Sequence, residues 1–173
     1  MNYLAGIDPG LTGALVVLSM TGEIISIQDA PTITVKMGKK NRTHLVETQM
    51  VAMLENAKSL GPLQAFIENV HSMPKQGVSS MFSMGMGFGL WLGILAALRI
   101  PVTRVEPLRW KKEMGIAGGA EKGASVVRGL QLFPDCRDLT RQYKRGGVML
   151  DTYLHGRADA LLLAAYGRRQ SVK

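Results

Sequence analysis

The chain has 173 residues, of which 46% are hydrophobic and 20% charged, a composition that excludes an intrinsically disordered protein. This length suits one domain with a substantial core, so we expect residues 1–173 to form a single domain. Lys and Arg number 21 against 13 Asp and Glu, and the resulting net charge of +8 favours a polyanionic partner such as nucleic acid.

The sequence carries no sign of secretion or of membrane insertion. Its N-terminus lacks a basic segment followed by an apolar one. The longest apolar run, residues 88–98, is about half of the roughly 20 residues that span a bilayer. The single cysteine, Cys136, excludes an internal disulfide and a four-cysteine zinc site. We therefore predict a soluble, cytoplasmic protein with no membrane partner.

The first part of the chain predicts a sheet with one helix inserted. Three short strands separated by turns are predicted at residues 3–8, 13–18 and 23–28, as in an antiparallel meander. We expect a polar loop at residues 31–43, a helix at 43–60 and a further strand at 63–70.

The remainder of the chain predicts mostly helices. A loop at residues 71–80 leads to a buried helix rich in Met and Gly at 81–98, and a strand follows at 101–105. We then expect a helical turn at 107–114, a flexible loop at 115–119, a helix at 121–132, a polar and basic segment at 134–150, and a last helix at 151–166. This order predicts a mixed α/β sheet with helices on both faces.

Three isolated acids are embedded in apolar sequence. Asp8 ends an apolar strand just before a turn, Glu68 ends a later strand, and Asp159 lies near the start of the last predicted helix. A buried carboxylate is costly unless a cation or a hydrogen-bond network compensates it. If the two strands are parallel neighbours, Asp8 and Glu68 meet at the sheet edge where α/β folds place their ligands. His155 lies four residues before Asp159 on the same helical surface, and Asp151 one turn further back.

Clustered carboxylates repel one another and persist as anions when divalent cations neutralise them. Hard oxygen ligands select Mg²⁺ or Mn²⁺, and two such ions can activate water and stabilise the leaving oxygen of a phosphodiester. Taken singly, each acid also has an ordinary alternative role as a cap or a turn former. The pattern of all three indicates a metal site.

Three short motifs resemble those of a known enzyme family. The string GIDPG at residues 6–10, IENV at 67–70 and ADAL at 158–161 resemble, in this order, the acidic motifs of the RuvC-type Holliday junction resolvases, especially phage-encoded ones, within the RNase H-like nucleases. The resemblance covers most of the chain. It implies an RNase H-like fold with a mixed five-stranded sheet, and a metal-dependent endonuclease of DNA recombination and repair. Asp8, Glu68 and Asp159 would hold two Mg²⁺ ions, for which Mn²⁺ can substitute.

A fourth likeness concerns two lysines. The family has one lysine before a glycine-containing loop and one after it, both near the scissile phosphate. Lys111 and Lys122 match these positions best, and Lys112 competes with Lys111 for the first. In this role the ammonium groups hold phosphate and offset negative charge, and the alternative is a solvated basic loop.

The chain departs from the family at the fourth ligand. The family usually has an Asp or His three residues before the final aspartate, where this chain has Gly156. His155 is our candidate substitute, as a metal ligand or a proton shuttle. Asp151 is its rival, and an exposed helical histidine without a role is the alternative for His155.

Family members use the loop after the second motif to probe the junction core. The matching loop here lacks an aromatic Phe or Tyr before Phe82, so we assign DNA contact to His71, Met73, Lys75 and Gln76. Other basic residues are candidate contacts to the DNA backbone: Lys36, Lys39, Lys40, Arg42, Lys112, Arg141, Lys144, Arg145, Arg168 and Arg169.

The resemblance implies an endonuclease that resolves Holliday junctions or other branched DNA by paired symmetric nicks. Because two cuts need two active sites, it also implies a homodimer, with the helix at 81–98 as its seam. If a phage encodes the chain, it would act in the host cytoplasm; a helicase partner is unknown.

Other functions compete with this prediction. They are another RNase H-like nuclease, acting on branched DNA in general or on RNA–DNA hybrids, a DNA-binding protein without catalysis, and an actin-like or sugar-kinase-like ATP-binding module. The last shares only the first motif and would need a second copy of the phosphate-binding hairpin, which this chain lacks.

Overall fold

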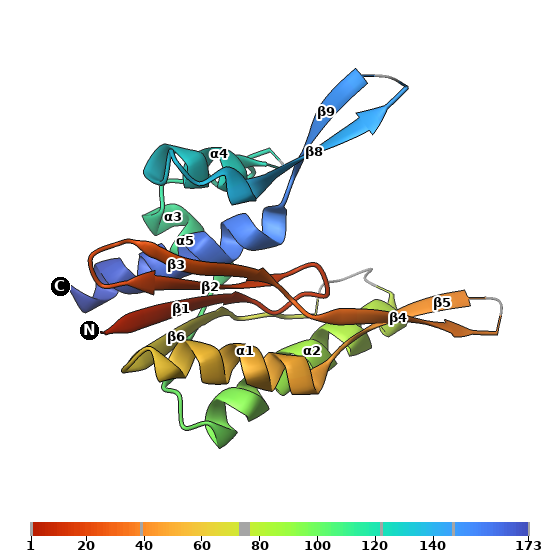
Figure 1. Cartoon of the computed structure of the whole chain (residues 1–173), viewed down its shortest axis with the longest axis horizontal. Helices are drawn as coiled ribbons and strands as arrows, with labels where there is room; N and C mark the ends of the chain where they lie inside the picture. The colour runs from red at the N-terminus through yellow and green to blue at the C-terminus, as the bar shows by residue number, and fades with distance from the viewer. Residues whose placement is uncertain (1, 39, 73–76, 122, 147, 173) are drawn as a thin grey trace.

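A five-stranded mixed sheet forms the centre of the computed structural model, which describes residues 2–38, 40–72, 77–121, 123–146 and 148–172. The strands lie in the order β3 (Ile24–Asp29), β2 (Ala14–Ser19), β1 (Tyr3–Asp8), β6 (Leu63–Glu68) and β7 (Val102–Val105). β3, β2 and β1 are antiparallel, whereas β1, β6 and β7 are parallel. The predicted meander and five-stranded mixed sheet are confirmed (Figure 1).

Helices cover both faces of this sheet, as predicted (Figure 1). On one side lie α3 (Pro107–Glu113), α4 (Ala124–Leu132) and α5 (His155–Ser171); on the other lie α1 (Glu47–Ser59) and α2 (Val78–Ala97). Alternation along the strands divides the core accordingly. Leu4 and Phe66 pack in the cluster with α5, whereas Ala5 and Ile7 pack in the cluster with α1 and α2.

The register between β1 and β6 brings two of the predicted acids to the same edge. Gly6 lies opposite Phe66, and Ile7 opposite Ile67. Because the strands run parallel, Asp8 and Glu68 terminate neighbouring strands at the same end. α5 crosses β1 so closely that a Cβ atom on Gly6 would overlap the carbonyl oxygen of Ala160. The glycine therefore sets the contact between β1 and α5.

Two segments predicted to lack regular structure are β-hairpins instead. The predicted loop at residues 31–43 is wrong, because β4 (Thr32–Met37) pairs with β5 (Lys40–Leu45). The polar segment at 134–150 contains the 3₁₀ turn Arg137–Leu139, β8 (Thr140–Arg145) and part of β9 (Val148–Tyr153), which pairs with β8. The β-branched residues at 32–35 favour a strand in the first hairpin, and Tyr143 and Tyr153 favour strands in the second, although the lysines and arginines of both hairpins suggest a loop.

The last helix begins later than predicted. α5 starts at His155 rather than at residue 151, because residues up to Tyr153 are paired in β9. Asp151 consequently lies on an exposed strand opposite Gln142 and not on the helix that carries Asp159. The prediction that Asp151 occupies one more helical turn is therefore wrong.

Helix α2 is mostly exposed, contrary to the prediction of a buried helix. Its buried residues are Gly87, Trp91 and Leu95, on the side that faces the sheet. Among the described residues, α2 is also the one helix that is long and apolar enough to cross a membrane, with a mean hydropathy of 1.5. Length and composition alone are weak evidence for a membrane span, since any long apolar helix that docks on another protein meets the same criterion.

Candidate active site

Asp8 lies at the end of β1, where the chain turns into β2. Its Oδ1 accepts a hydrogen bond of 3.0 Å from the backbone N–H of Gly10, so the turn itself holds the carboxylate. The pKa of Asp8 is raised to about 6, mainly by burial and also by nearby Asp159, although the Gly10 hydrogen bond lowers it. Lys111 also lowers this pKa by favouring the charged form.

Glu68 ends β6 beside Asp8. Its Oε1 accepts a 3.0 Å hydrogen bond from the indole Nε1 of Trp110 on α3. The pKa of Glu68 is raised to about 7, mainly by burial, although the indole hydrogen bond lowers it. Asp159 and Asp8 both raise this pKa, and Lys111 lowers it. The pKa of Glu68 is therefore affected by both other acids and by the cation Lys111.

Asp159 comes from the second turn of α5. The first turn of this helix rests on the β1–β2 turn, where a Cβ atom on Gly156 would overlap the carbonyl oxygen of Thr12. Burial raises the pKa of Asp159, whereas a hydrogen bond from Ser125, then Lys111 and His155, lower it. Its Oδ1 is buried and has no hydrogen-bond partner among the described residues.

The three predicted acids thus converge from three elements on one end of the sheet. Asp159 raises the pKa of both Asp8 and Glu68, Asp8 raises that of Glu68, and Lys111 lowers the pKa of all three acids. Within the described residues, no group of three or more His, Cys, Asp and Glu side chains already has the spacing of a metal cage. The chemistry nevertheless fits divalent cations, because burial raises the pKa of all three carboxyl groups and Oδ1 of Asp159 has no hydrogen-bond partner among the described residues.

A cavity of about 1090 Å³ opens beside Asp159, whereas Asp8 and Glu68 are not among its lining residues. Asp159 and His155 line it from α5, Lys111 and Lys112 from α3, and the glycine-containing loop 115–120 closes one side. His155 thus lies in the same cavity as Asp159, whereas Asp151 is not among the lining residues. The second predicted lysine, Lys122, lies outside the described residues.

The predicted junction-probing loop is described only at its start. His71 is exposed, and its Nε2 lies 2.8 Å from Oε2 of Glu106. Asn69 donates to Oε1 of the same glutamate at 2.6 Å, and these contacts lower the pKa of Glu106. The sequence did not indicate this cluster. Met73, Lys75 and Gln76 lie outside the described residues.

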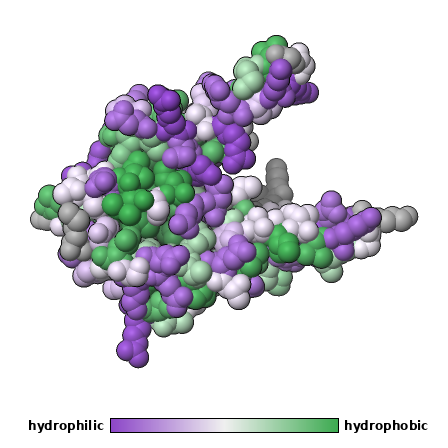
Figure 2. Space-filling model, viewed as in Figure 1, coloured by the Kyte–Doolittle hydropathy of each residue, from purple (hydrophilic) through white to green (hydrophobic). Residues whose placement is uncertain are grey.

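Most of the predicted DNA-contacting cations lie on the two hairpins. Lys36, Lys40 and Arg42 are exposed on β4–β5, and Arg141, Lys144 and Arg145 on β8–β9; Lys39 lies outside the described residues. Both hairpins extend from the side of the molecule at which β1 ends (Figure 1). Figure 2 shows them as separate projections that carry both hydrophilic and hydrophobic residues, with a hollow between them.

Arg168 and Arg169 lie elsewhere. They belong to the last turns of α5, at the opposite end of the helix from His155. Each donates to a backbone carbonyl, Arg168 to Met20 and Arg169 to Glu113. These two cations help to fix the C-terminal end of α5.

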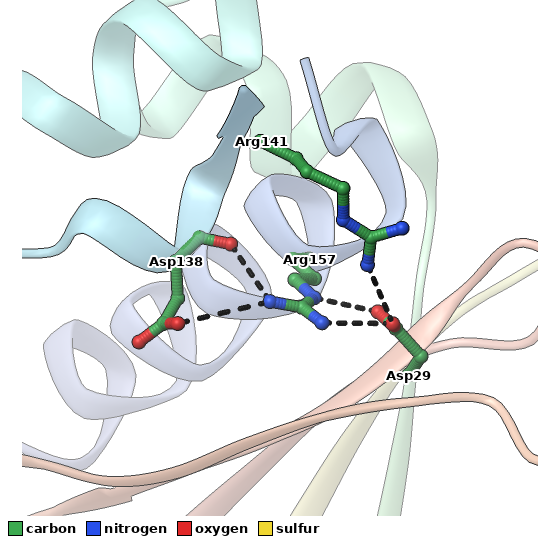
Figure 3. A network of polar contacts seen from close by, with 4 residues as sticks. All are labelled: Asp29, Asp138, Arg141 and Arg157. Atoms are coloured by element: carbon green, nitrogen blue, oxygen red, sulfur yellow. Dashed lines mark hydrogen bonds and ion pairs between the residues drawn. The ribbon is translucent and has the colours of Figure 1, made fainter. Parts of the chain in front are cut away.

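An ion-pair network that the sequence did not reveal anchors the head of α5 (Figure 3). Arg157 donates two hydrogen bonds, of 2.6 and 2.8 Å, to the carboxylate of Asp29 at the end of β3. It also donates to the carbonyl of Asp138 at 3.1 Å, and Arg141 lies 3.9 Å from Asp29. Because Arg157 stands between His155 and Asp159, this bidentate pair orients the turn that carries both.

The sheet order, the acids at the ends of β1 and β6 and the acid on the covering helix together define an RNase H-like fold of the RuvC type. Two solved structures have this fold. RuvC of Thermus thermophilus in complex with a Holliday junction substrate is 15% identical, with a TM-score of 0.58. A second T. thermophilus RuvC structure is 18% identical, with a TM-score of 0.54. Each alignment covers 98% of this chain and 96% of the other.

Sequence comparison adds a curated relative. The chain is 27% identical over 139 residues to the chloroplastic Holliday junction resolvase MOC1 of Chlamydomonas reinhardtii. The match covers 76% of this chain but 15% of that protein, so the chain corresponds to a small part of the relative. No protein-family model matches the chain. The two solved structures agree with the predicted fold.

Proposed function

We propose that the chain is a divalent-metal-dependent endonuclease that resolves four-way DNA junctions by paired symmetric nicks. One observation carries the proposal: three acids from β1, β6 and α5 converge beside a lysine in a RuvC-type fold. The names of the relative and of the solved structure, both tied to Holliday junctions, support the choice of substrate.

Each residue of the site has a proposed role. Asp8, Glu68 and Asp159 hold two Mg²⁺ ions, or Mn²⁺ in their place, and His155 is the fourth ligand or a proton acceptor because it shares a cavity with Asp159. Bound ions supply activation of water and stabilisation of the leaving oxygen. Lys111 offsets the carboxylate charge and holds the scissile phosphate, and Lys122 is proposed for the same task from its motif alone.

The hairpins are the proposed grip on the DNA arms. On one face of β4–β5, cross-strand pairs set Val35 beside Arg42 and Met37 beside Lys40. The row of cations matches the charge of a phosphodiester strand, and a two-stranded ribbon is narrow enough for the major groove of B-DNA. Because β8–β9 projects from the same side of the molecule, two arms of a junction can be held at once.

A second copy of the chain is the proposed partner of α2. This helix carries no charged residue and exposes Phe82 and Met86. Its glycines at 85, 89 and 93 recur every four residues and have open space around them, so another helix can approach closely. A homodimer would present two sites to the junction, as paired nicks require. We keep the cytoplasm, of a host cell if a phage encodes the chain, as the predicted location.

The proposal is tested with the variant Asp8→Asn and a labelled four-way junction. We expect this variant to bind the junction with unchanged affinity and to cut it at least about 10³-fold more slowly, since it removes charge that only the reaction needs. Asp151→Asn is the matched control, because Asp151 is an exposed aspartate on β9. It should cut at the wild-type rate, whereas His155→Ala should be impaired. Wild-type cleavage by Asp8→Asn would rule out the metal assignment.

The choice of substrate needs a separate comparison. Four-way junctions, Y-forks, RNA–DNA hybrids and linear duplexes are incubated with the wild-type protein in Mg²⁺, and the nicks are mapped. We expect paired nicks placed symmetrically in the four-way junction. Preferential cleavage of hybrids or of forks would instead identify another RNase H-like nuclease.

A further inference from the structure

Trp110 contacts two groups of the proposed active site at once. It lies at the centre of the short helix α3, is fully buried, and packs in the core cluster beneath α5. Its indole N–H donates to Oε1 of Glu68 at 3.0 Å. The Nζ atom of Lys111 lies over the face of the same indole, 5.1 Å from the ring centroid. One side chain therefore touches both an acid and a cation of the site.

We propose that Trp110 is a positioning residue that sets the carboxylate of Glu68 and the ammonium of Lys111 relative to each other. The inference rests on the proposed function, because it assumes that Glu68 holds a divalent ion. The hydrogen bond fixes the rotation of the carboxylate. The cation–π contact restrains the flexible lysine stem.

The chemistry of the donor favours this role. A buried carboxylate needs a hydrogen bond, yet an Arg or Lys partner would neutralise it and compete with a divalent cation. The indole is uncharged and has a single N–H, so it satisfies one lone pair and leaves the negative charge of Glu68 available to an ion.

The chain contains its own control in Trp91. There are two tryptophans, and both are fully buried. Trp91 lies on α2 in the other core cluster, and its Nε1 has no hydrogen-bond partner among the described residues. A Trp→Phe substitution removes the same atoms at both positions. Only at Trp110 does it remove a hydrogen bond to a proposed metal ligand.

The first experiment compares Trp110→Phe with Trp91→Phe. We expect Trp110→Phe to raise the Mg²⁺ concentration that half-saturates junction cleavage by about 10-fold, the low end of effects for residues that orient metal ligands. For Trp91→Phe we expect a change of less than about twofold. Equal Mg²⁺ requirements of the two variants would overturn the inference.

The second experiment needs neither DNA nor cleavage. In Trp91→Phe the sole tryptophan is Trp110, so its emission should change when Mg²⁺ or Mn²⁺ is added. In Trp110→Phe the emission comes from Trp91 and should stay constant. Adding Glu68→Gln to Trp91→Phe should abolish the response. This arm decides the matter even if Trp110→Phe does not fold.

The two proposals fail in distinguishable ways. If Asp8→Asn is inactive but saturating metal leaves the emission of Trp110 unchanged, the nuclease assignment stands and the role of Trp110 falls. If Asp8→Asn cleaves normally, the metal site itself is wrong and the role of Trp110 falls with it.

Discussion

Helices α5 and α2 flank the central sheet on opposite faces, and they differ in what covers them. Ten of the residues of α5 are buried, from Gly156 to Gly167, against strands of the same chain. In α2, which is longer and has no charged residue, the buried residues are Gly87, Trp91 and Leu95. Apolar sequence that the chain covers itself serves as a scaffold. Apolar sequence that it leaves exposed calls for a partner.

Glycines make the same distinction. At Gly6 and Gly156 a Cβ atom would overlap backbone across the contact of α5 with the β1 strand and turn. At Gly89 and Gly93 on α2, nothing lies within 4 Å of such an atom. Gly6 and Gly156 permit close packing of α5 within the chain. Gly89 and Gly93 leave space on the surface of α2 into which another helix can pack.

The largest effect is expected from Gly6→Ala, which disrupts the buried contact between β1 and α5. The added methyl group would meet the carbonyl oxygen of Ala160, and backbone cannot move aside without shifting α5. We expect a loss of about 3 kcal/mol or more in the free energy of unfolding, measured with urea. Gly89→Ala on α2 should change it by no more than about 1 kcal/mol, because alanine suits an exposed helix. Similar losses for the two variants would contradict the comparison.

A smaller effect on stability is expected from a change of pH, because folding buries Asp8 and Glu68. The folded state binds protons more tightly than the unfolded chain, since the pKa rises from 3.8 to about 6 for Asp8 and from 4.5 to about 7 for Glu68. In a chelator, the contribution of these groups to stability is therefore fully present below their unfolded-state pKa values of 3.8 and 4.5, and it is lost as the pH rises through about 6 and 7. We expect a loss on the order of 2 kcal/mol for the pair.

The pH effect is isolated by comparing the wild type with the double variant Asp8→Asn, Glu68→Gln in thermal melts from pH 5 to 8. The double variant should lose less stability across this window. Added Mg²⁺ should stabilise the wild type most at the alkaline end, where both acids are ionised and bind cations. If the melting temperatures of the two proteins in chelator change with pH in parallel, the pKa values of Asp8 and Glu68 are not raised by folding.

Local pattern was enough to predict a mixed sheet with helices on both faces, and the resemblance to the resolvase family implied its RNase H-like arrangement. Asp8 and Glu68 end apolar strands, and their meeting was predicted on the condition that the two strands are parallel neighbours, as β1 and β6 are. The hairpins were missed because the cations of β4, β5 and β8 suggest a loop, while their alternation is weak. The many charged residues obscure the two-residue alternation by which strands are recognised, so the pairing of these hairpins became evident only in the structure.

The supports of the site could not be predicted for a different reason. Trp110 meets Glu68 across 42 residues of sequence, and Arg157 meets Asp29 across 128. Nothing near either residue in the chain marks its partner. Ser125 beside Asp159 is a similar case. Motifs reveal residues with a chemical role, whereas the residues that orient them depend on tertiary contacts.

The smallest effect, about 10-fold or 1.4 kcal/mol, is expected on self-association and tests the exposed helix directly. Phe82 on α2 is 69% exposed, and a charge there should weaken a dimer without disturbing the core. We expect Phe82→Asp to raise the dimer dissociation constant by at least this factor in sedimentation or light scattering. Val172→Asp is the matched control, because Val172 at the end of α5 is an equally exposed apolar residue, at 73%.

A wild-type dimer that survives Phe82→Asp would place the seam elsewhere. A monomeric wild type that partitions into lipid vesicles through α2 would contradict the dimer and favour a membrane surface as the cover. Junction cleavage sharpens the result, because a monomer has one site. Phe82→Asp should therefore leave single nicks in the four-way junction, while Val172→Asp cuts both strands, since paired cuts depend on the helix that the chain leaves uncovered.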